Sequence, residues 1–600
     1  MQLKRVEKQR GDERMEQTIP RSEFPRPDFV RSQWEPLNGT WEFSFEEPVF
    51  DREILVPFCY QSEKSGIGEM EDHKTVWYRR KVALEKEKLK GKHLLLKFGA
   101  VDSEARVWSN GQYAGEHRGG YSSFEMDITS FVKAGENVIC VQATDDTNAD
   151  KPRGKQSWTG EKFGCWYTPC TGIWQSVWLE YVGRVHLERV KFTPDLSELN
   201  ALCEVFLSET EDTLVEVTAT AQEGNIYLGS QRLLCRHGYG KTTLTFPDYD
   251  IRRDDLLWTP DNPNLIDVRI RVFSGGSLCG ENSREDKSET ADEVAAYFGM
   301  RSIAYSNGRI SLNGNVFYQR LILDQGYWPD SILTPPSDEA IRKDILMTKE
   351  MGFNGARKHQ KIEDPRYYYW ADKLGLLVWG ELPSAYEFND RAVEASAREL
   401  TRFVERDYNH PCIVTWVPVN ESWGVRQILE NTQQQDYCRM LTYLLRALDP
   451  VRLISSNDGW EQVNETDICA VHDYALFPST VGKYDDMEAL CDGYAESRYL
   501  FAAGNEYQGQ PVILTEYGGI AFEKEEKGWG YYGKVKNEEE FLERLQPITE
   551  FLIRSGKFSG FCYTQLTDVM QEVNGLLCED RTPKVPAEKL KEIFGAPVFA

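Results

Sequence analysis

Two glutamates stand where strand-like runs of the sequence give way to small or polar residues. Glu421 ends the apolar run in IVTWVPVNESWG, and Glu516 lies in PVILTEYGG. Each carboxylate is therefore expected at the C-terminal mouth of a strand. When two such carboxylates face each other across a cleft, one can protonate a glycosidic oxygen while the other attacks the sugar carbon. The pair therefore indicates cleavage of a glycosidic bond.

The amino-acid composition limits the kinds of partner that the protein can bind. The chain has 600 residues, and its 70 basic against 96 acidic residues give a net charge of −26. That charge opposes broad attraction to nucleic acid or to an anionic membrane, so a small carbohydrate is the expected partner. The N-terminal segment MQLKRVEKQRGDERMEQ is charged where a signal peptide is apolar, and no run of about 18 apolar residues follows. These features predict a cytoplasmic protein.

The cysteines predict buried free thiols. There are 13, without CxxC pairs or metal-ligand spacing. A disulfide between Cys165 and Cys170 is the alternative interpretation, which a reducing compartment disfavours. His472 and Asp473 superficially resemble metal ligands, but no third ligand has suitable spacing. We therefore expect neither a metal nor a cofactor.

The first half of the chain is predicted to be β structure in two domains. Residues 1–183 contain short β-branched and aromatic segments such as KHLLLKFGAV and NVICVQAT between turn residues, which is typical of a jelly roll. Residues 184–297 contain further strand-like segments at a spacing that favours an immunoglobulin-like sandwich. The hydrophilic stretch 280–294, GENSREDKSETADEV, is predicted to be the hinge that leaves this sandwich.

Residues 298–600 alternate strand-like runs with amphipathic segments of helical length. Eight strand candidates, from VFYQRLILD to FSGFCYTQL, predict a catalytic (β/α)8 TIM barrel, so the whole chain is a multidomain β plus α/β protein. Ser337 is a predicted helix start, and Gly352 and Gly375 are predicted helix stops.

A barrel builds its chemistry just beyond the C-terminal ends of its strands. Besides Glu421 and Glu516, the predicted substrate-binding residues are Asp324, Trp328, Arg357, His359, Asn420, His472, Tyr474, Tyr563 and, in a later loop, Trp529. Other polar residues at these strand ends are Glu381, Asn457, Asp458, Asp473, Gln565 and Asp568. An alternative interpretation of His359 is a histidine buried in the core. An alternative interpretation of Glu381 is a structural ion pair with an Arg or Lys on a neighbouring strand.

Several motifs in this order resemble glycoside hydrolase family 2. They are GAVDSEARVWSNGQYAGEHRGGYSSFEMDIT, MGFNGARKHQ, ADKLGLLVWGELP, VPVNES and TEYGG. The resemblance implies that Glu421 is the acid/base, Glu516 the nucleophile and Asn420 a ligand of the sugar 2-hydroxyl. It also implies that Arg357 and Tyr474 lie beside Glu516, and that the protein forms homo-oligomers.

These environments predict a retaining mechanism. Glu516 should stay charged beside Arg357, whereas Glu421, with less compensation, should keep a raised pKa and donate its proton. Retention requires that the two carboxylates lie about 5–5.5 Å apart, and about 8 Å would indicate inversion.

The substrate is predicted from one loop. Family members that cleave glucuronides carry an Asn-x-Lys pair after the eighth strand, where this chain has Glu572, Val573 and Asn574. A β-galactosidase is therefore the first expectation. A β-hexuronidase (galacturonidase or glucuronidase) or an arabinosidase is the alternative, because Arg357 or Lys358 could receive a carboxylate. A non-catalytic carbohydrate-binding protein is the alternative of another class.

Aromatic residues outside the strand ends could extend the pocket. The segment 518–541 holds Trp529, Tyr531 and Tyr532, which could stack on a sugar in a leaving-group subsite or could simply anchor the loop. Trp166, near the end of the first domain, could reach the pocket from outside the barrel.

Overall fold

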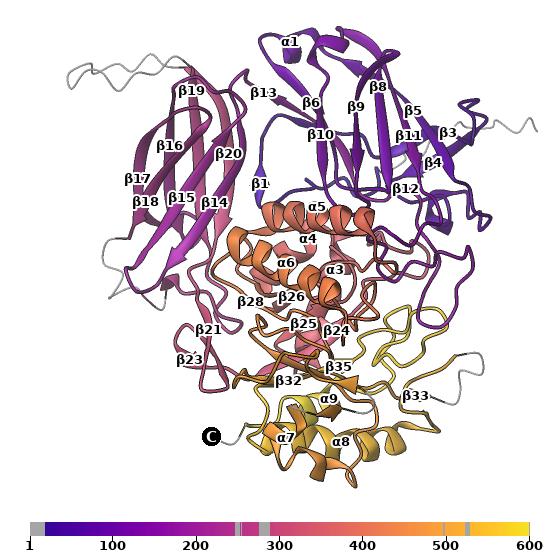
Figure 1. Ribbon diagram of the computed structural model, residues 1–600. Coiled ribbons are helices and arrows are strands. Elements are labelled where there is room, and N and C mark those ends of the chain that lie inside the picture. Colours follow the sequence, from indigo (N-terminus) through magenta and orange to yellow (C-terminus); the bar gives the residue numbers. More distant parts are fainter. Residues whose placement is uncertain are drawn as a thin grey trace, which may run out of the picture.

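The computed structural model describes residues 19–246, 253, 255–274, 289–491, 493–495, 498–522 and 528–598. Two β sandwiches lie beside each other over one side of a barrel (Figure 1). The charged N-terminal segment lies outside the described residues. No helix within the described ranges has the length and apolar character needed to cross a membrane.

The first domain is the predicted jelly roll, built from two antiparallel sheets. The strand β11 (Gly135–Thr144) alternates buried and partly exposed residues, so one face lies in the core between the sheets. In spatial order, the four-stranded sheet contains β10 (Phe124–Asp127), β6 (His93–Phe98), β13 (Val177–Val182) and β2 (Trp34–Pro36). The six-stranded sheet contains β4 (Arg52–Val56), β3 (Gly39–Phe45), β5 (Thr75–Leu84), β11 (Gly135–Thr144), β8 (Glu104–Ser109) and β9 (Gln112–Arg118).

The second domain is the predicted immunoglobulin-like sandwich. One sheet contains β14 (Leu187–Asp195), β15 (Asn200–Leu207) and β18 (Tyr239–Thr245). The other contains β1 (Phe29–Val30), β20 (Glu289–Phe298), β19 (Ile266–Ser274), β16 (Thr213–Ala221) and β17 (Ile226–Cys235). Its edge strand β1 comes from the N-terminal part of the chain and pairs antiparallel with β20.

The prediction that residues 280–294 form a hinge is wrong for residues 289–294. Residues 289–294 belong to β20, which lies between β1 and β19 in the sheet. Glu289 and Glu293 on this strand face solvent, whereas Val294 lies in the core and the buried Asp292 binds Arg31. Residues 280–288 lie outside the described part of the chain.

The C-terminal part forms the predicted TIM barrel, with all eight strands parallel. In spatial order they are β28 (Leu453–Ile454), β27 (Ile413–Val417), β26 (Leu377–Glu381), β25 (Gly355–Lys358), β24 (Gln319–Asp324), β35 (Gly560–Thr564), β32 (Val512–Gly518) and β29 (Cys469–His472). Within the described residues, strands β28 and β29 do not pair with each other. Between them a backbone hydrogen bond, from Asp467 N to Ile454 O at 2.8 Å, lies just before β29 begins.

Helices cover the outside of the barrel (Figure 1). They are α3 (Asp338–Glu350), α4 (Pro365–Leu374), α5 (Asp390–Asp407), α6 (Thr432–Leu448), the short α7 (Met487–Cys491), α8 (Glu538–Arg554) and α9 (Ala587–Phe594). Ser337 caps α3 by accepting from Ala340 N, and Gly375 ends α4 in the left-handed conformation. Helix α3 ends at Glu350, one residue before its cap Met351, and Gly352 follows at a φ of 96°. The predicted helix start and stops are thus confirmed.

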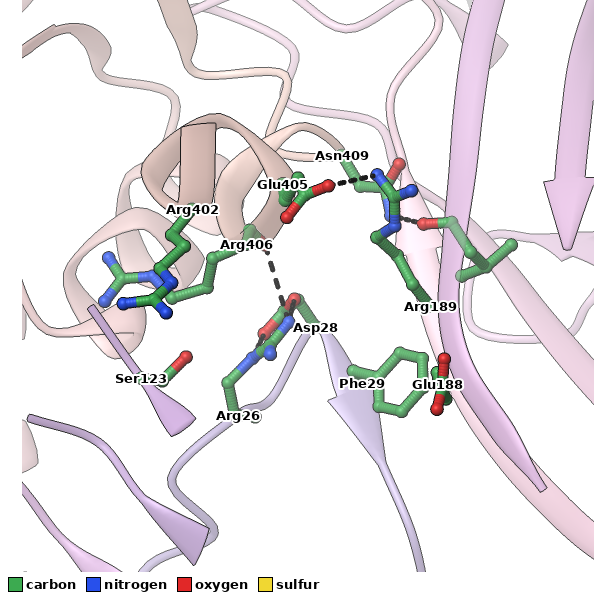
Figure 2. A pocket seen from close by; sticks show the side chains of 11 residues that line it. Arg26, Asp28, Phe29, Ser123, Glu188, Arg189, Arg402, Glu405, Arg406 and Asn409 are labelled. Atoms are coloured by element: carbon green, nitrogen blue, oxygen red, sulfur yellow. Dashed lines mark hydrogen bonds and ion pairs between the residues drawn. The ribbon is translucent and has the colours of Figure 1, made fainter. Parts of the chain in front are cut away.

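Buried ion pairs of Arg31 join the two sandwiches, and a partly exposed ion pair lies at the junction with the barrel. Arg31, which directly follows β1, contacts Glu180 of β13 at 2.6 Å and Asp292 of β20 at 2.9 Å. Figure 2 shows the neighbouring junction with α5, where Arg26 pairs with Asp28 at 2.7 Å and Arg189 lies 3.6 Å from Glu405. This junction surrounds a cavity of about 160 Å³ that contains none of the predicted site residues.

We predict that Arg31→Met lowers the free energy of unfolding by about 3–5 kcal/mol, because it removes the cation from buried Asp292 and leaves buried Glu180 with Lys97 at 3.4 Å. Denaturant titration of the whole chain measures this change. Arg118→Met is the matched control, because Arg118 and Glu104 form an exposed pair at 3.9 Å. Its effect should stay below about 1 kcal/mol, and equal effects of both substitutions would contradict the prediction.

Candidate active site

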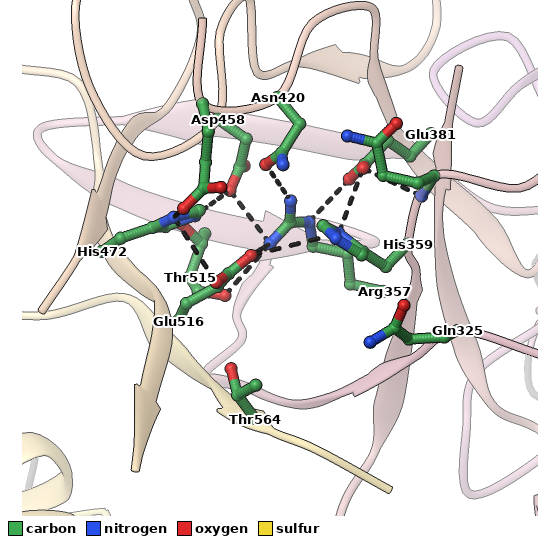
Figure 3. Close-up of polar contacts among 12 residues, drawn as sticks. Gln325, Arg357, His359, Glu381, Asn420, Asp458, His472, Thr515, Glu516 and Thr564 are labelled. Atoms are coloured by element: carbon green, nitrogen blue, oxygen red, sulfur yellow. Dashed lines mark hydrogen bonds and ion pairs between the residues drawn. The ribbon is translucent and has the colours of Figure 1, made fainter. Parts of the chain in front are cut away.

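A fully buried arginine lies at the centre of the barrel mouth (Figure 3). Arg357 of β25 donates from Nε to Glu381 at 2.8 Å and from Nη1 to Glu516 at 2.9 Å. Its Nη2 donates to Asn420 Oδ1 at 2.6 Å. The arginine therefore connects the C-terminal ends of four strands, β25, β26, β27 and β32.

The two predicted glutamates face a common histidine. One oxygen of Glu421, one of Glu516 and one ring nitrogen of His472 all lie within 4.8 Å of one another. His472 Nδ1 lies 2.9 Å from Glu421 Oε1, and its Nε2 lies 2.9 Å from Asp458 Oδ1. Tyr474 donates to Glu516 Oε2 at 2.5 Å. The structure thus brings the two carboxylates together.

The expected raised pKa of Glu421 is wrong. Burial alone would raise it, but the hydrogen bond and charge of His472 lower the pKa of Glu421 to about 2. Burial would lower the pKa of His472, yet the surrounding carboxylates Glu516, Asp458 and Glu421 raise it to about 10. At neutral pH the proton of this pair therefore resides on His472.

The cluster of Glu421, His472 and Glu516 has the donor types of a metal site. However, His472 uses both ring nitrogens for the contacts to Glu421 and Asp458. Its imidazole would have to leave one of them before it could bind a metal. Asp473, the other residue considered as a ligand, accepts from Tyr484 at 2.6 Å and lies 2.5 Å from Lys483.

His359 and Glu381 lie beside the same arginine. His359 Nδ1 lies 3.2 Å from Glu381 and 4.0 Å from Glu516. Burial, together with the charges of Lys155 and Arg357, lowers the pKa of His359 well below its usual range, so the ring is neutral. Burial also raises the pKa of Glu381 to about 7, despite the charge of Arg357. Glu381 forms the interstrand ion pair that was its alternative interpretation.

Three predicted site residues are engaged elsewhere. Asp324 forms a buried ion pair with Lys358 at 2.9 Å. Trp328 lies beneath Arg581, whose guanidinium carbon is 3.7 Å from the ring centroid. Tyr563 packs on Tyr517 and on Phe594 of α9, because its side chain points from the strand toward the helices. The structure gives these three no contact with the two glutamates.

A cavity of about 530 Å³ opens beside the cluster, large enough for a sugar. It is lined by Glu421, Trp460, Tyr474, Ala475, Phe477, Tyr531 and Tyr532. Tyr531 stacks on Tyr474 with 4.1 Å between ring centroids, and Trp529 contacts Tyr531 edge-on at 4.8 Å. The aromatic segment thus reaches the pocket through Tyr531 and Tyr532, with Trp529 behind Tyr531. Its residues 523–527 lie outside the described part.

Sequence reasoning missed three residues near the pocket: Trp460, Trp423 and Lys155. Trp423 Nε1 donates to Glu421 Oε2 at 3.1 Å, and Trp166 of the first domain packs edge-on against Trp423 at 5.0 Å. Trp166 therefore reaches the site, as considered above. The position of Trp423, two residues after Glu421, could have signalled its role. Lys155 lies in another domain, and nothing in its local sequence singles it out.

Comparison with known proteins agrees with this architecture. Residues 37–150 match the family model described as "Glycosyl hydrolases family 2, sugar binding domain", and residues 336–596 match "Glycosyl hydrolases family 2, TIM barrel domain". The chain belongs to glycoside hydrolase family 2. The resemblance predicted from its motifs is therefore confirmed.

Individual members of the family are distant from this chain. A β-galactosidase of Thermoanaerobacter pseudethanolicus is 26% identical over 437 residues, which cover 70% of this chain and 53% of that protein. The chain spans about half the length of the curated relatives it matches.

Solved structures in the family share the fold. A β-galacturonidase from Eisenbergiella tayi superposes with a TM-score of 0.74 at 18% identity, covering 97% of this chain and 99% of that one. A β-D-glucuronidase from Dictyoglomus thermophilum has a TM-score of 0.74 at 21% identity, with coverages of 96% and 99%.

The shifted pKa values of His472 and Glu421 predict how the stability of the protein depends on pH. His472 has a folded pKa of about 10 against 6.5, so its contribution is complete below pH 6.5 and is lost as the pH rises through 10. Glu421 has a folded pKa of about 2 against 4.5, so its contribution is lost as the pH falls below 4.5. We expect a loss on the order of 2–4 kcal/mol between pH 6.5 and 10.

Denaturant titrations at several pH values measure this loss. His472→Asn should be less stable near pH 6 and should show a smaller decline toward pH 10, because the titrating imidazole is gone. An unchanged decline in the variant would refute the assignment of the proton to His472.

Proposed function

We propose that this protein is a retaining exo-β-glycosidase that removes a terminal β-linked sugar through a covalent glycosyl-enzyme intermediate. The observation that carries the proposal is the separation of the two carboxylates, whose oxygens lie within 4.8 Å in one site beside a sugar-sized cavity. Retaining enzymes need about 5–5.5 Å, whereas inverting enzymes need about 6.5–9.5 Å to admit a water.

In the first step Glu516 is the proposed nucleophile. Arg357 lies 2.9 Å from its carboxylate, which attacks the anomeric carbon as the bond to the leaving oxygen breaks. The Tyr474 hydroxyl donates to the other oxygen of Glu516 and keeps the carboxylate in place. Asn420, oriented by Arg357, is the proposed ligand of the sugar 2-hydroxyl.

Glu421 is the proposed acid and base, with His472 as its proton reserve. His472 gives its proton to Glu421 across the 2.9 Å contact between Nδ1 and Oε1, and Glu421 passes that proton to the leaving oxygen, which leaves Glu421 as a carboxylate and His472 neutral. In the second step the Glu421 carboxylate takes a proton from water, which attacks the anomeric carbon and releases Glu516. The proton then returns to His472, so the cycle is balanced and the sugar keeps its configuration.

We propose a neutral hexoside, with β-galactosides first, as the substrate. The Asn-x-Lys pair of glucuronide-cleaving relatives is replaced by Glu572 and Asn574, which offers no cation to a sugar carboxylate. Arg357 and Lys358, considered above as receivers of a carboxylate, are buried in ion pairs with Glu381, Glu516, Asp324 and Glu363.

A β-hexuronide is the second candidate substrate. The observation that favours it is the buried ammonium of Lys155, which has no carboxylate within 4.0 Å among the described residues. A sugar carboxylate could provide its counter-charge.

The proposal extends to location and domain limits. The free thiols of the twelve described cysteines, Cys165 and Cys170 included, support a cytoplasmic location. We keep domain boundaries near residues 183 and 297, with the N-terminal strand β1 added to the second sandwich.

We predict that Glu516→Ala and Glu421→Ala lose activity in different ways on p-nitrophenyl β-glycosides of galactose, glucuronate, galacturonate, mannose and arabinose. Both should lose about 100-fold or more in kcat. Azide should rescue Glu516→Ala with formation of the α-glycosyl azide, because it fills the place of the nucleophile. Azide should rescue Glu421→Ala with the β-glycosyl azide, because it replaces water in the second step.

The anomeric configuration of each product, read by proton NMR, decides between the roles. Glu539→Ala, on the exposed first turn of α8, is the control and should match the parent. If Glu516→Ala gave the β-glycosyl azide and Glu421→Ala the α-glycosyl azide, the roles of nucleophile and acid/base would have to be exchanged. Parental activity in Glu516→Ala would remove the proposed nucleophile, and a parent inactive on every sugar would favour the binding-protein alternative.

A further inference from the structure

A loop of the first domain delivers a lysine to the barrel mouth. Arg153 N and Gly154 N donate to Ser384 O of the barrel at 3.0 and 3.2 Å, and Tyr386 donates from its hydroxyl to Gly154 O. Gly154 has a φ of 61°, and a β-carbon there would collide with Gln360 O. This close docking places the next residue, Lys155, against the barrel.

The ammonium of Lys155 is buried without a neutralising partner nearby. Lys155 is 5% exposed, and among the described residues no carboxylate lies within 4.0 Å of it. It lies beside the Cys165 thiol and the Tyr386 hydroxyl, and burial raises the pKa of both groups, so neither is charged at neutral pH. Burial lowers the pKa of Lys155, but its neighbours, Glu572 and Glu421 among them, raise it above its usual range, so the ammonium stays charged and can donate hydrogen bonds.

A buried carboxylate shares the partner Tyr167 with the lysine loop. Glu572, 1% exposed, accepts from the Tyr167 hydroxyl and from Asn574 Nδ2 at 3.2 Å. Tyr167 N donates to Lys155 O at 2.8 Å, so one residue fixes both the lysine backbone and the glutamate side chain. The charge of Lys155 acts on Glu572, although the two are further apart than an ion pair.

Both groups lie within electrostatic range of the two central glutamates. The positive charge of Lys155 helps to lower the pKa of Glu421, and Glu516 acts on Glu572. The side chains Trp166 and Tyr386, which flank the lysine loop, both pack on Trp423, the hydrogen-bond donor to Glu421. The lysine loop therefore packs against the surroundings of Glu421, and Tyr167 fixes Glu572 to that loop.

We propose that Lys155 and Glu572 bind the hydroxyl groups of a neutral sugar in the glycone site, with Lys155 donating and Glu572 accepting. This inference rests on the proposed glycosidase function and names its substrate class. A sugar hydroxyl both donates and accepts, so it can join two groups that are too far apart to pair directly. A sugar carboxylate would meet Lys155 favourably but would be repelled by Glu572.

The test compares p-nitrophenyl β-galactoside with p-nitrophenyl β-galacturonide, which differ only at carbon 6. Lys155→Met should lower kcat/KM on the galactoside about tenfold or more, because it removes a charged hydrogen-bond donor. Glu572→Gln should raise the ratio of galacturonide to galactoside activity about tenfold, because it removes the repelling charge and leaves Lys155. Lys162→Met, an exposed lysine of the same loop, should behave like the parent.

Three outcomes would overturn the inference: Lys155→Met matching Lys162→Met, an unchanged ratio in Glu572→Gln, or a parent that prefers the galacturonide. Lys155→Arg keeps the charge and should retain more activity than Lys155→Met, which separates loss of charge from misfolding. If no sugar is hydrolysed, the proposed function fails. Tryptophan-fluorescence titration with galactose and galacturonate then still decides the inference, which requires weaker galactose binding in Lys155→Met than in the parent.

Discussion

The barrel mouth depends on one buried guanidinium. Arg357 is fully enclosed and contacts three carboxylates, those of Glu381, Glu516 and Asp458, at 2.8, 2.9 and 3.2 Å. These partners come from strands on both sides of β25, so the arginine holds the C-terminal ends of the barrel in a common arrangement. Without it the carboxylates would repel one another in a place where water cannot screen them. The position of Glu516 beside Glu421 follows from this centre.

The sequence predicted the strand ends well because each barrel strand is a short apolar run that stops at a polar residue. It could not predict which strand residues face inward. The strand β35 is buried on both faces, so the alternation that separates core from solvent is absent, and Tyr563 was placed on the wrong side. The same limit applies to Asp324, whose partner Lys358 lies on the next strand.

Other properties arise only when distant segments meet. The low pKa of Glu421 comes from His472, which arrives from β29, and a local reading of VPVNES contains no sign of it. Lys155 reaches the site from a different domain. The first residues of strand β20 were taken for a hinge because they are mostly charged or polar, although the two edges of the strand pair with β1 and β19. In each case the deciding neighbour is remote in sequence.

The placement of β1 has a consequence for biosynthesis. Its partner β20, and Asp292 that binds Arg31, are translated only after the first sandwich and most of the second have left the ribosome. The N-terminal segment must therefore wait in the nascent chain with an unpaired strand edge, and Arg31 must wait for the second of its two carboxylate partners. Closure of the second sandwich is thus a late folding event, in which β1 near the N-terminus pairs with β20 in the middle of the chain.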